Sequence, residues 1–189
     1  MSETDDVELM RLAGRGDEQA FEQLVERHQN LVIGTVAKML GGFEGAEDIA
    51  QQVFVRAWQS APRYRPEAKF TTWLLTIARN LVFNESRRRR RGFFQPFEND
   101  DGSVMDIRDD SGRDAAAALS ERETQQAVDA AITALPEAQR MAIILRRFEA
   151  MPYEDIAVVL KTSVPAVKSL LFRAREDLRE RLKGVLVEG

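Results

Sequence analysis

The sequence contains no cysteine and only one histidine, His28, among its 189 residues. The absence of cysteine excludes disulfides, cysteine-ligated zinc and thiol redox sensing. One histidine cannot form a histidine-based metal cluster, so we expect neither a metal nor a cofactor. The sequence also lacks the long alternation of Val, Ile and Thr that indicates a sheet. Its composition, 44% hydrophobic and 31% charged, is typical of a helix-rich globular protein.

Long apolar segments are absent as well. The N-terminal stretch MSETDDVELM is acidic and has no apolar core, so it does not resemble a signal peptide. No apolar run approaches the length of a membrane span. We therefore expect a cytoplasmic protein without membrane insertion.

The net charge of −4 conceals a segregated pattern. Counted along the sequence, residues 1–60 carry 5 basic and 11 acidic side chains, and residues 61–91 carry 9 basic and 2 acidic ones. Residues 92–123 carry 3 and 9, and residues 124–189 carry 10 and 9. The balances are −6, +7, −6 and +1. One strongly basic segment on an otherwise acidic chain indicates a surface that faces a polyanion.

Periodicity and composition divide the chain into three parts. Residues 8–91 show helical periodicity nearly throughout, and it returns over residues 115–184. Residues 92–114 are rich in Gly, Asp and Asn and predict a flexible acidic linker. The sequence therefore predicts an all-α protein made of two small helical domains on a tether.

The helix predicted from about Thr72 through the arginines 87–91 has two distinct stripes. Apolar residues recur at helical spacing along one side: Phe70, Trp73, Leu74, Ile77, Ala78 and Leu81. The opposite stripe has polar groups, cations and one aromatic: Thr72, Thr76, Arg79, Asn80, Phe83, Asn84 and Arg87. This stripe suits either an ordinary solvated face or contact with bases and phosphates.

A helix-turn-helix pattern lies near the C-terminus. A short helix over 153–160 is followed by the turn Lys161-Thr162 and by a long basic helix. Ser163 is placed to cap that helix, and Pro165 falls in its first turn. Ala157 offers a small side chain where the two helices approach. The pattern favours DNA binding over a helical hairpin that merely has a basic face.

Several ordered motifs together resemble one family. The segments GAEDIAQQVFVRAW, FTTWLLTIARN, ALPEAQRMAIILRRFEAMPYEDIAVVL and VKSLLFRAR are similar to those of bacterial sigma factors. The similarity is to the small extracytoplasmic-function group of the sigma-70 family, and it extends over both predicted domains. It implies a region 2-like helical bundle followed by a region 4-like helix-turn-helix domain, and a stress-responsive transcription initiation factor without enzymatic activity.

The resemblance also implies partners and site residues. The first domain would bind the clamp of the largest subunit of core RNA polymerase through Asp48, Gln51, Gln52 and Phe54. The same domain would melt the minus-ten promoter element and capture its bases through Arg63, Tyr64, Arg65, Lys69, Trp73, Arg79, Asn80, Phe83, Asn84 and Arg87. We weigh Trp73 first as a core residue and second as a melting residue. Arg88 to Arg91 would form a less specific phosphate clamp.

The second domain would lie near the polymerase flap and read the minus-thirty-five element. Its implied DNA-contacting residues are Pro165, Ala166, Lys168, Ser169, Phe172, Arg173 and Arg175. The acidic linker would thread through the polymerase, and an anti-sigma factor would hold the protein inactive.

Four positions depart from the family pattern: Gln52 and Asn84 replace the usual acidic residues, Lys161 replaces a frequent Gly, and Leu170 replaces a frequent Arg. At Lys161 this predicts a left-handed backbone conformation strained by a side chain.

Two other functions fit parts of the sequence. A stand-alone helix-turn-helix regulator would use the first domain as a sensor, but the acidic linker and the polar stripe argue against it. A metal-dependent nuclease would use Glu47, Asp48 and their neighbours. However, acidic residues at a helix start usually complement the helix dipole, and no phosphate-cradling Gly loop supports that chemistry.

Overall fold

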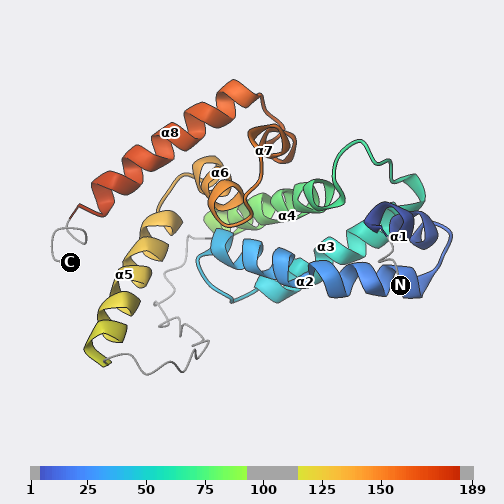
Figure 1. Cartoon of the computed structure of the whole chain (residues 1–189), viewed down its shortest axis with the longest axis horizontal. Helices are drawn as coiled ribbons and strands as arrows, with labels where there is room; N and C mark the ends of the chain where they lie inside the picture. The colour runs from blue at the N-terminus through green and yellow to red at the C-terminus, as the bar shows by residue number, and fades with distance from the viewer. Residues whose placement is uncertain (1–4, 93–114, 184–189) are drawn as a thin grey trace.

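The computed structural model describes residues 5–92 and 115–183, with side chains described over 5–91 and 122–183. An N-terminal unit contains four α-helices and a short 3-10 helix: α1 Asp6–Ala13, α2 Glu18–Leu40, α3 Ala46–Ser60, η1 Ala61–Arg63 and α4 Phe70–Gly92 (Figure 1). A C-terminal unit contains α5 Ala115–Thr133, α6 Glu137–Arg147, α7 Tyr153–Leu160 and α8 Val164–Arg181. Within the described ranges every regular element is a helix, which confirms the predicted fold class.

Local chemistry sets where the helices begin and end. The Asp17 carboxylate accepts a hydrogen bond from the Ala20 N–H at 3.0 Å and caps α2. Gly41 ends that helix in the left-handed conformation, with φ of 82°. Ser163 caps α8 by accepting from the Ala166 N–H at 3.3 Å, as the sequence predicts.

The N-terminal unit forms a bundle in which α1, α2, α3 and α4 all contribute buried side chains. Val36, Val53 and Leu74 are fully buried there. The carboxylate of Asp6 joins α1 to α2, because its two oxygens contact Arg27 Nη1 at 3.1 Å and His28 Nε2 at 2.8 Å. The only histidine thus serves a contact between helices.

One side of α4 differs from the sequence expectation. Thr72 was expected on the exposed polar stripe, yet its side chain is completely buried. Leu75 and Val82, about one and three turns further along the same side, are buried as well. Helix α4 packs against α2, α3 and α7, so it has a second buried side that its own periodicity did not indicate.

The two units contact each other directly. Helix α4 packs against α7, and α2 packs against α6 and α5, whereas α8 packs on α6 and α7 (Figure 1). The sequence predicted two domains joined only by a tether. In the structure their buried side chains belong to one continuous hydrophobic cluster.

Two further features of the described residues bear on function. None of the helices there combines the length and apolar character needed to cross a membrane. The same part of the chain holds no group of three or more His, Asp or Glu side chains that could bind a metal ion.

Candidate nucleic-acid interface

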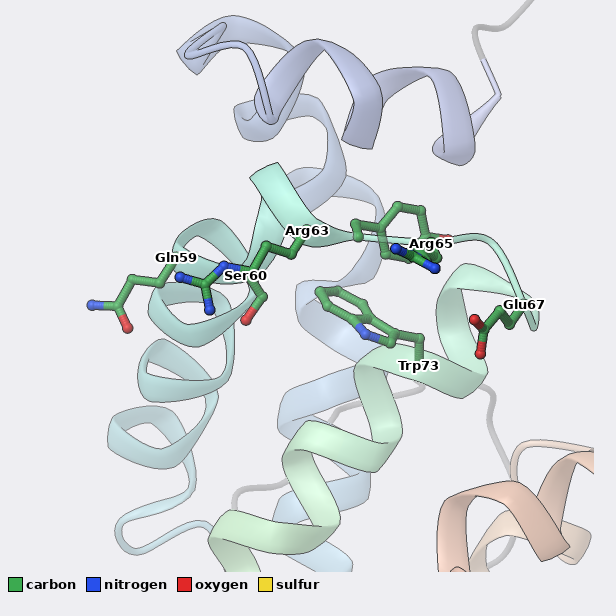
Figure 2. Close-up of a pocket in the computed structure, with 7 residues that line it drawn as sticks. Gln59, Ser60, Arg63, Arg65, Glu67 and Trp73 are labelled. Atoms are coloured by element: carbon green, nitrogen blue, oxygen red, sulfur yellow. The ribbon is translucent and has the colours of Figure 1, made fainter.

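A cavity of about 360 Å³ lies where the segment after α3 passes over the start of α4. Seven residues line it: Gln59, Ser60, Arg63, Tyr64, Arg65, Glu67 and Trp73. Figure 2 shows the Trp73 indole lying beneath the loop that carries Arg63 and Arg65. The cavity therefore combines aromatic rings with exposed cations, which is the combination that binds single-stranded nucleic acid.

An aromatic cluster forms the floor of this cavity. The Tyr64 ring meets the Trp73 ring edge-on, with centroids 5.0 Å apart, and lies 6.2 Å from Phe70. Phe70 also packs 5.0 Å from the His28 ring, which anchors the cluster on α2. These contacts hold the loop against α4, so the cavity is preformed.

The hydroxyl of Tyr64 is buried and has no hydrogen-bond partner among the described residues. Its burial, followed by the nearby charges of Asp5 and Asp6, raises the pKa of the phenol above its usual value. Tyr64 therefore remains neutral near pH 7 and presents an uncharged aromatic ring.

The outward side of α4 carries the predicted base-reading residues. Asn84 and Arg87 are exposed, while Asn80 and Phe83 are half-buried. Arg79 stacks over the Phe83 ring at 4.5 Å and donates from Nη1 to Asn80 Oδ1 at 3.0 Å. Because its oxygen is engaged, Asn80 has its amide N–H groups left to donate outward. Burial, with a smaller effect of Arg87, lowers the pKa of Arg79, but a guanidinium remains charged at any physiological pH.

The five arginines at the end of α4 are not equivalent. Glu85 forms ion pairs with Arg88 at 2.8 Å and Arg89 at 3.0 Å, and these hydrogen bonds lower the pKa of its carboxyl. Arg90 contacts Glu137 of the C-terminal unit at 2.9 Å. Arg87 and Arg91 are exposed at either end of the run.

The predicted polymerase contacts lie on the outer side of α3, except for one. Asp48, Gln51 and Gln52 are exposed, but Phe54 is 8% exposed and lies in the core. The adjacent Val55 is 54% exposed and shares the outer side with Asp48 and Gln51, seven and four residues earlier. Val55 was not predicted from the sequence. The signal that could have indicated it is an apolar residue at a position that helical spacing places among polar ones.

Helix α8 presents the predicted minus-thirty-five residues together on one unit. Pro165, Lys168, Ser169, Phe172, Arg173 and Arg175 are exposed, and Ala166 is half-buried. Phe172, at 64% exposure, is the most exposed large apolar side chain among the described residues. Ser169 donates its hydroxyl to the Pro165 carbonyl at 3.1 Å, whereas Leu170 packs partly against the protein's own core.

The structure thus brings the predicted residues into three separate groups: the cavity with the outward side of α4, the outer side of α3, and the start of α8. Lys69 is exposed at the edge of the first group, where it lies 3.6 Å from Asp155.

Family models match both units. Sigma-70 region 2 matches residues 24–92, and Sigma-70 region 4 matches residues 125–178. The chain is 32% identical to the RNA polymerase sigma-H factor of Pseudomonas aeruginosa over 100% of this chain and 99% of that protein. It is also 32% identical to the ECF RNA polymerase sigma-E factor of Escherichia coli over 97% and 96% of the two chains.

Solved structures agree with these matches. The sigma factor RpoE, solved in complex with the anti-sigma factor NepR from Bartonella quintana, has a TM-score of 0.68 at 25% identity, covering 86% of this chain and 96% of that one. CnrH, solved in complex with the cytosolic domain of CnrY, has a TM-score of 0.67 at 27% identity, covering 95% and 97%. The chain therefore belongs to the extracytoplasmic-function group of the sigma-70 family of RNA polymerase sigma factors.

Proposed function

We propose that this protein binds core RNA polymerase and directs it to promoters by reading the minus-thirty-five element with α8 and opening the minus-ten element with the N-terminal unit. The observation that carries this proposal is the preformed aromatic and cationic cavity beside the outward side of α4. We assign the initiation functions to residues 8–91 and 115–184, with 92–114 as the connecting linker. No covalent chemistry is required of the protein itself.

The cavity suits the capture of an unstacked base. Extracting a base from a duplex costs a few kcal/mol, and stacking on an aromatic side chain offsets about 1–3 kcal/mol of it. All four lining residues of this group fit the proposal: Tyr64 and Trp73 would supply the rings, and Arg63 and Arg65 would contact the flanking phosphates. Asn80 and Asn84, further along α4, would contact neighbouring bases of the separated strand, with Lys69, Arg79, Phe83 and Arg87 around them.

Helix α8 suits a major groove. Its N-terminal half presents Lys168, Phe172 and Arg173 in exposed positions, as expected of a recognition helix. Phe172 offers an apolar surface for a thymine methyl group, and the cations offer contacts to guanine or phosphate. The remaining predicted residues, Pro165, Ala166, Ser169 and Arg175, would support this contact.

The outer side of α3 is the proposed polymerase contact. Asp48, Gln51 and Gln52 supply a polar surface, and we add Val55 as its apolar centre because partners bind such residues preferentially when a polar rim surrounds them. A similar sigma factor, RpoE of Bartonella quintana, was solved in complex with the anti-sigma factor NepR. We propose that this protein also has an anti-sigma partner.

The central test is run-off transcription with E. coli core RNA polymerase on genomic fragments, followed by mapping of the start sites. We expect promoter-specific transcripts that depend on this protein. Failure of the purified, folded chain to bind core polymerase would falsify the proposal. A gel shift without polymerase distinguishes a stand-alone regulator, because that protein binds duplex DNA tightly by itself and a sigma factor does not.

Val55→Asp tests the polymerase contact. An exposed residue tolerates this change with little effect on folding, so we expect core binding to weaken about tenfold while the melting temperature stays nearly constant. Val55→Ala is the matched control and should reduce binding less. Equal affinities of Val55→Asp and the unmodified chain would remove Val55 from the interface.

A further inference from the structure

Helix α1 packs on α2 and on η1, with which the cavity loop, residues 61–69, begins (Figure 1). Three of its side chains are buried: Leu9, Met10 and Ala13. A Cβ atom on Gly14, directly after the helix, would lie 2.8 Å from the Ala61 carbonyl oxygen, so the end of α1 approaches η1 closely. The position of α1 therefore limits where the cavity loop can lie.

One carboxylate fixes α1 on α2. Asp6 Oδ1 accepts from Arg27 Nη1 at 3.1 Å, and Asp6 Oδ2 lies 2.8 Å from His28 Nε2. Because an ionised carboxylate only accepts, His28 Nε2 carries the hydrogen in this contact. The His28 side chain is 12% exposed, so water competes little for the bond. Hydrogen bonds to a charged group are among the stronger ones, and this one fixes the orientation of the imidazole.

The oriented imidazole supports the aromatic floor of the cavity. Its centroid lies 5.0 Å from that of Phe70, with the ring planes inclined by 54°. Phe70 in turn lies 5.8 Å from the Trp73 ring and 6.2 Å from the Tyr64 ring. A rotation of the imidazole would open space behind Phe70, and Phe70 would then move away from the two rings that line the cavity.

The start of α1 also lies close to the cavity floor itself. Burial raises the pKa of the Tyr64 phenol, and the charges of Asp5 and Asp6 raise it further, which requires these carboxylates to be near. Asp6 is therefore close to the aromatic cluster at two points. It holds His28, which contacts Phe70, and it faces the region of the Tyr64 phenol.

We propose that Asp6 and His28 are positioning residues for base capture, and that α1 sets the geometry of the aromatic floor through them. Neither residue lines the cavity, so both act through Phe70 rather than by contact with DNA. Helix α1 precedes residues 24–92, which the sigma-70 region 2 model matches, so this support begins outside that region. The inference rests on the proposed function for its purpose, whereas the geometry of the floor is a property of the free protein.

The test reads the floor in the free protein through the fluorescence of Trp73. The sequence has two tryptophans, so Trp58→Phe leaves Trp73 as the only one. Trp58 lies edge-on to Phe21 at 5.1 Å, and phenylalanine keeps an aromatic ring there. Quenching by acrylamide in this background measures how accessible the Trp73 indole is.

Asp6→Ala is compared with the matched control Glu8→Ala. Both changes remove one carboxylate from the first turn of α1, but Glu8 pairs with Arg11 of the same helix. We expect the quenching constant of Trp73 to rise about twofold in Asp6→Ala, because a contact that orders the floor is lost. In Glu8→Ala it should stay within about 1.2-fold of the background chain, as for other surface changes.

Conservative variants separate positioning from a general loss of stability. Asp6→Asn keeps an acceptor oxygen for His28 Nε2 and should restore quenching to within about 1.2-fold of the background chain. His28→Gln keeps an N–H donor but has no ring against Phe70, so it should quench like Asp6→Ala. If Asp6→Ala fails to fold by circular dichroism, His28→Gln decides. Unchanged quenching in the folded variant overturns the inference.

A second measurement follows promoter opening by the holoenzyme, with 2-aminopurine in the minus-ten element. We expect Asp6→Ala to reduce opening about tenfold, the size of one lost hydrogen bond to a charged group, with core polymerase binding unchanged. Normal opening by a variant whose floor is more accessible overturns the positioning role and leaves the proposed function intact. If the unmodified chain does not bind polymerase, the proposed function fails, while the fluorescence of Trp73 still decides whether α1 sets the floor.

Discussion

Lys161 shows how one residue can carry strain at the turn of the helix-turn-helix. Its φ of 54° and ψ of 50° lie in the left-handed region, as the sequence predicted from the presence of a side chain where Gly is frequent. The conformation persists because the Lys161 N–H bonds to the carbonyl of Val158 and the Thr162 N–H to that of Ala157, closing α7. A side chain in this conformation costs about 1–2 kcal/mol.

Replacing Lys161 with Gly should therefore stabilise the protein. We expect the free energy of unfolding to rise by about 0.5–1 kcal/mol, because relief of strain exceeds the greater chain entropy of Gly in the unfolded state. Urea unfolding measures it. Thr162→Gly, next in the same turn and without a positive φ, is the control and should destabilise. A loss of stability in Lys161→Gly would show that the turn is relaxed.

Two variants of Tyr64 distinguish what its aromatic ring and its hydroxyl each contribute to promoter opening. Tyr64→Ala removes part of the aromatic floor of the cavity. We expect promoter opening to weaken about tenfold or more, because stacking contributes about 1–3 kcal/mol per base. The fluorescence of 2-aminopurine in the minus-ten element measures the opening. Tyr64→Phe keeps the ring and removes a buried hydroxyl that has no partner among the described residues. We expect it to open promoters normally. Equal losses in both variants would argue against stacking.

At the scale of the element, α4 shows what periodicity can and cannot predict. Its core stripe and its extent were predicted within two residues at the start, because apolar residues every three to four positions are a strong signal. The burial of the side with Thr72, Leu75 and Val82 was not predicted, because it depends on which helices pack against α4, and one of these, α7, lies some 80 residues later in the chain. Periodicity reports that a face is apolar, not which distant element covers it.

The candidate site shows the same strengths and limits of prediction from the sequence. Charged and amide residues of α4 and α8 were predicted as exposed, and most are, because solvation favours it. On α3 the sequence selected Phe54, which is buried, and missed its exposed neighbour Val55. Both are apolar, so composition alone does not separate them; their helical positions do, because Val55 shares the side of Asp48 and Gln51 whereas Phe54 faces the core.

The arginines of α4 allow a matched comparison of phosphate contacts. All five arginines from 87 to 91 are exposed, and two of them, Arg88 and Arg89, already pair with Glu85. We expect Arg87→Gln with Arg91→Gln to reduce the salt slope of promoter binding by about 1.5, at roughly 0.7–0.9 per lost contact. Arg88→Gln with Arg89→Gln should reduce it less. Binding of the holoenzyme measured across a NaCl series decides, and equal slopes would show that Glu85 leaves its arginines available to DNA.

At the scale of the whole molecule, the structure shows which oppositely charged segments lie against each other. The basic block of residues 61–91 includes Lys69 and Arg90, and acids of the C-terminal unit lie against both. The sequence allowed the charges to be counted but not paired, since Arg90 and Glu137 are 47 residues apart. A basic surface exists in a protein with a net charge of −4 because the charges are segregated along the chain, and two of its cations lie against acids of the C-terminal unit.

A higher salt concentration should weaken the ion pairs between the two units. Raising NaCl from 50 to 500 mM shortens the screening length from about 14 Å to about 4 Å, which weakens exposed ion pairs but leaves apolar packing intact. We expect the radius of gyration of the free protein, measured by small-angle X-ray scattering, to increase with salt. In Glu137→Gln with Asp155→Asn the pairs are already absent, so its radius should begin larger and change less. If both proteins respond equally, the charges at the inter-unit interface do not hold the units together, and closure must depend on apolar packing between α4 and α7 and on the buried contact of Arg140 with the end of α2.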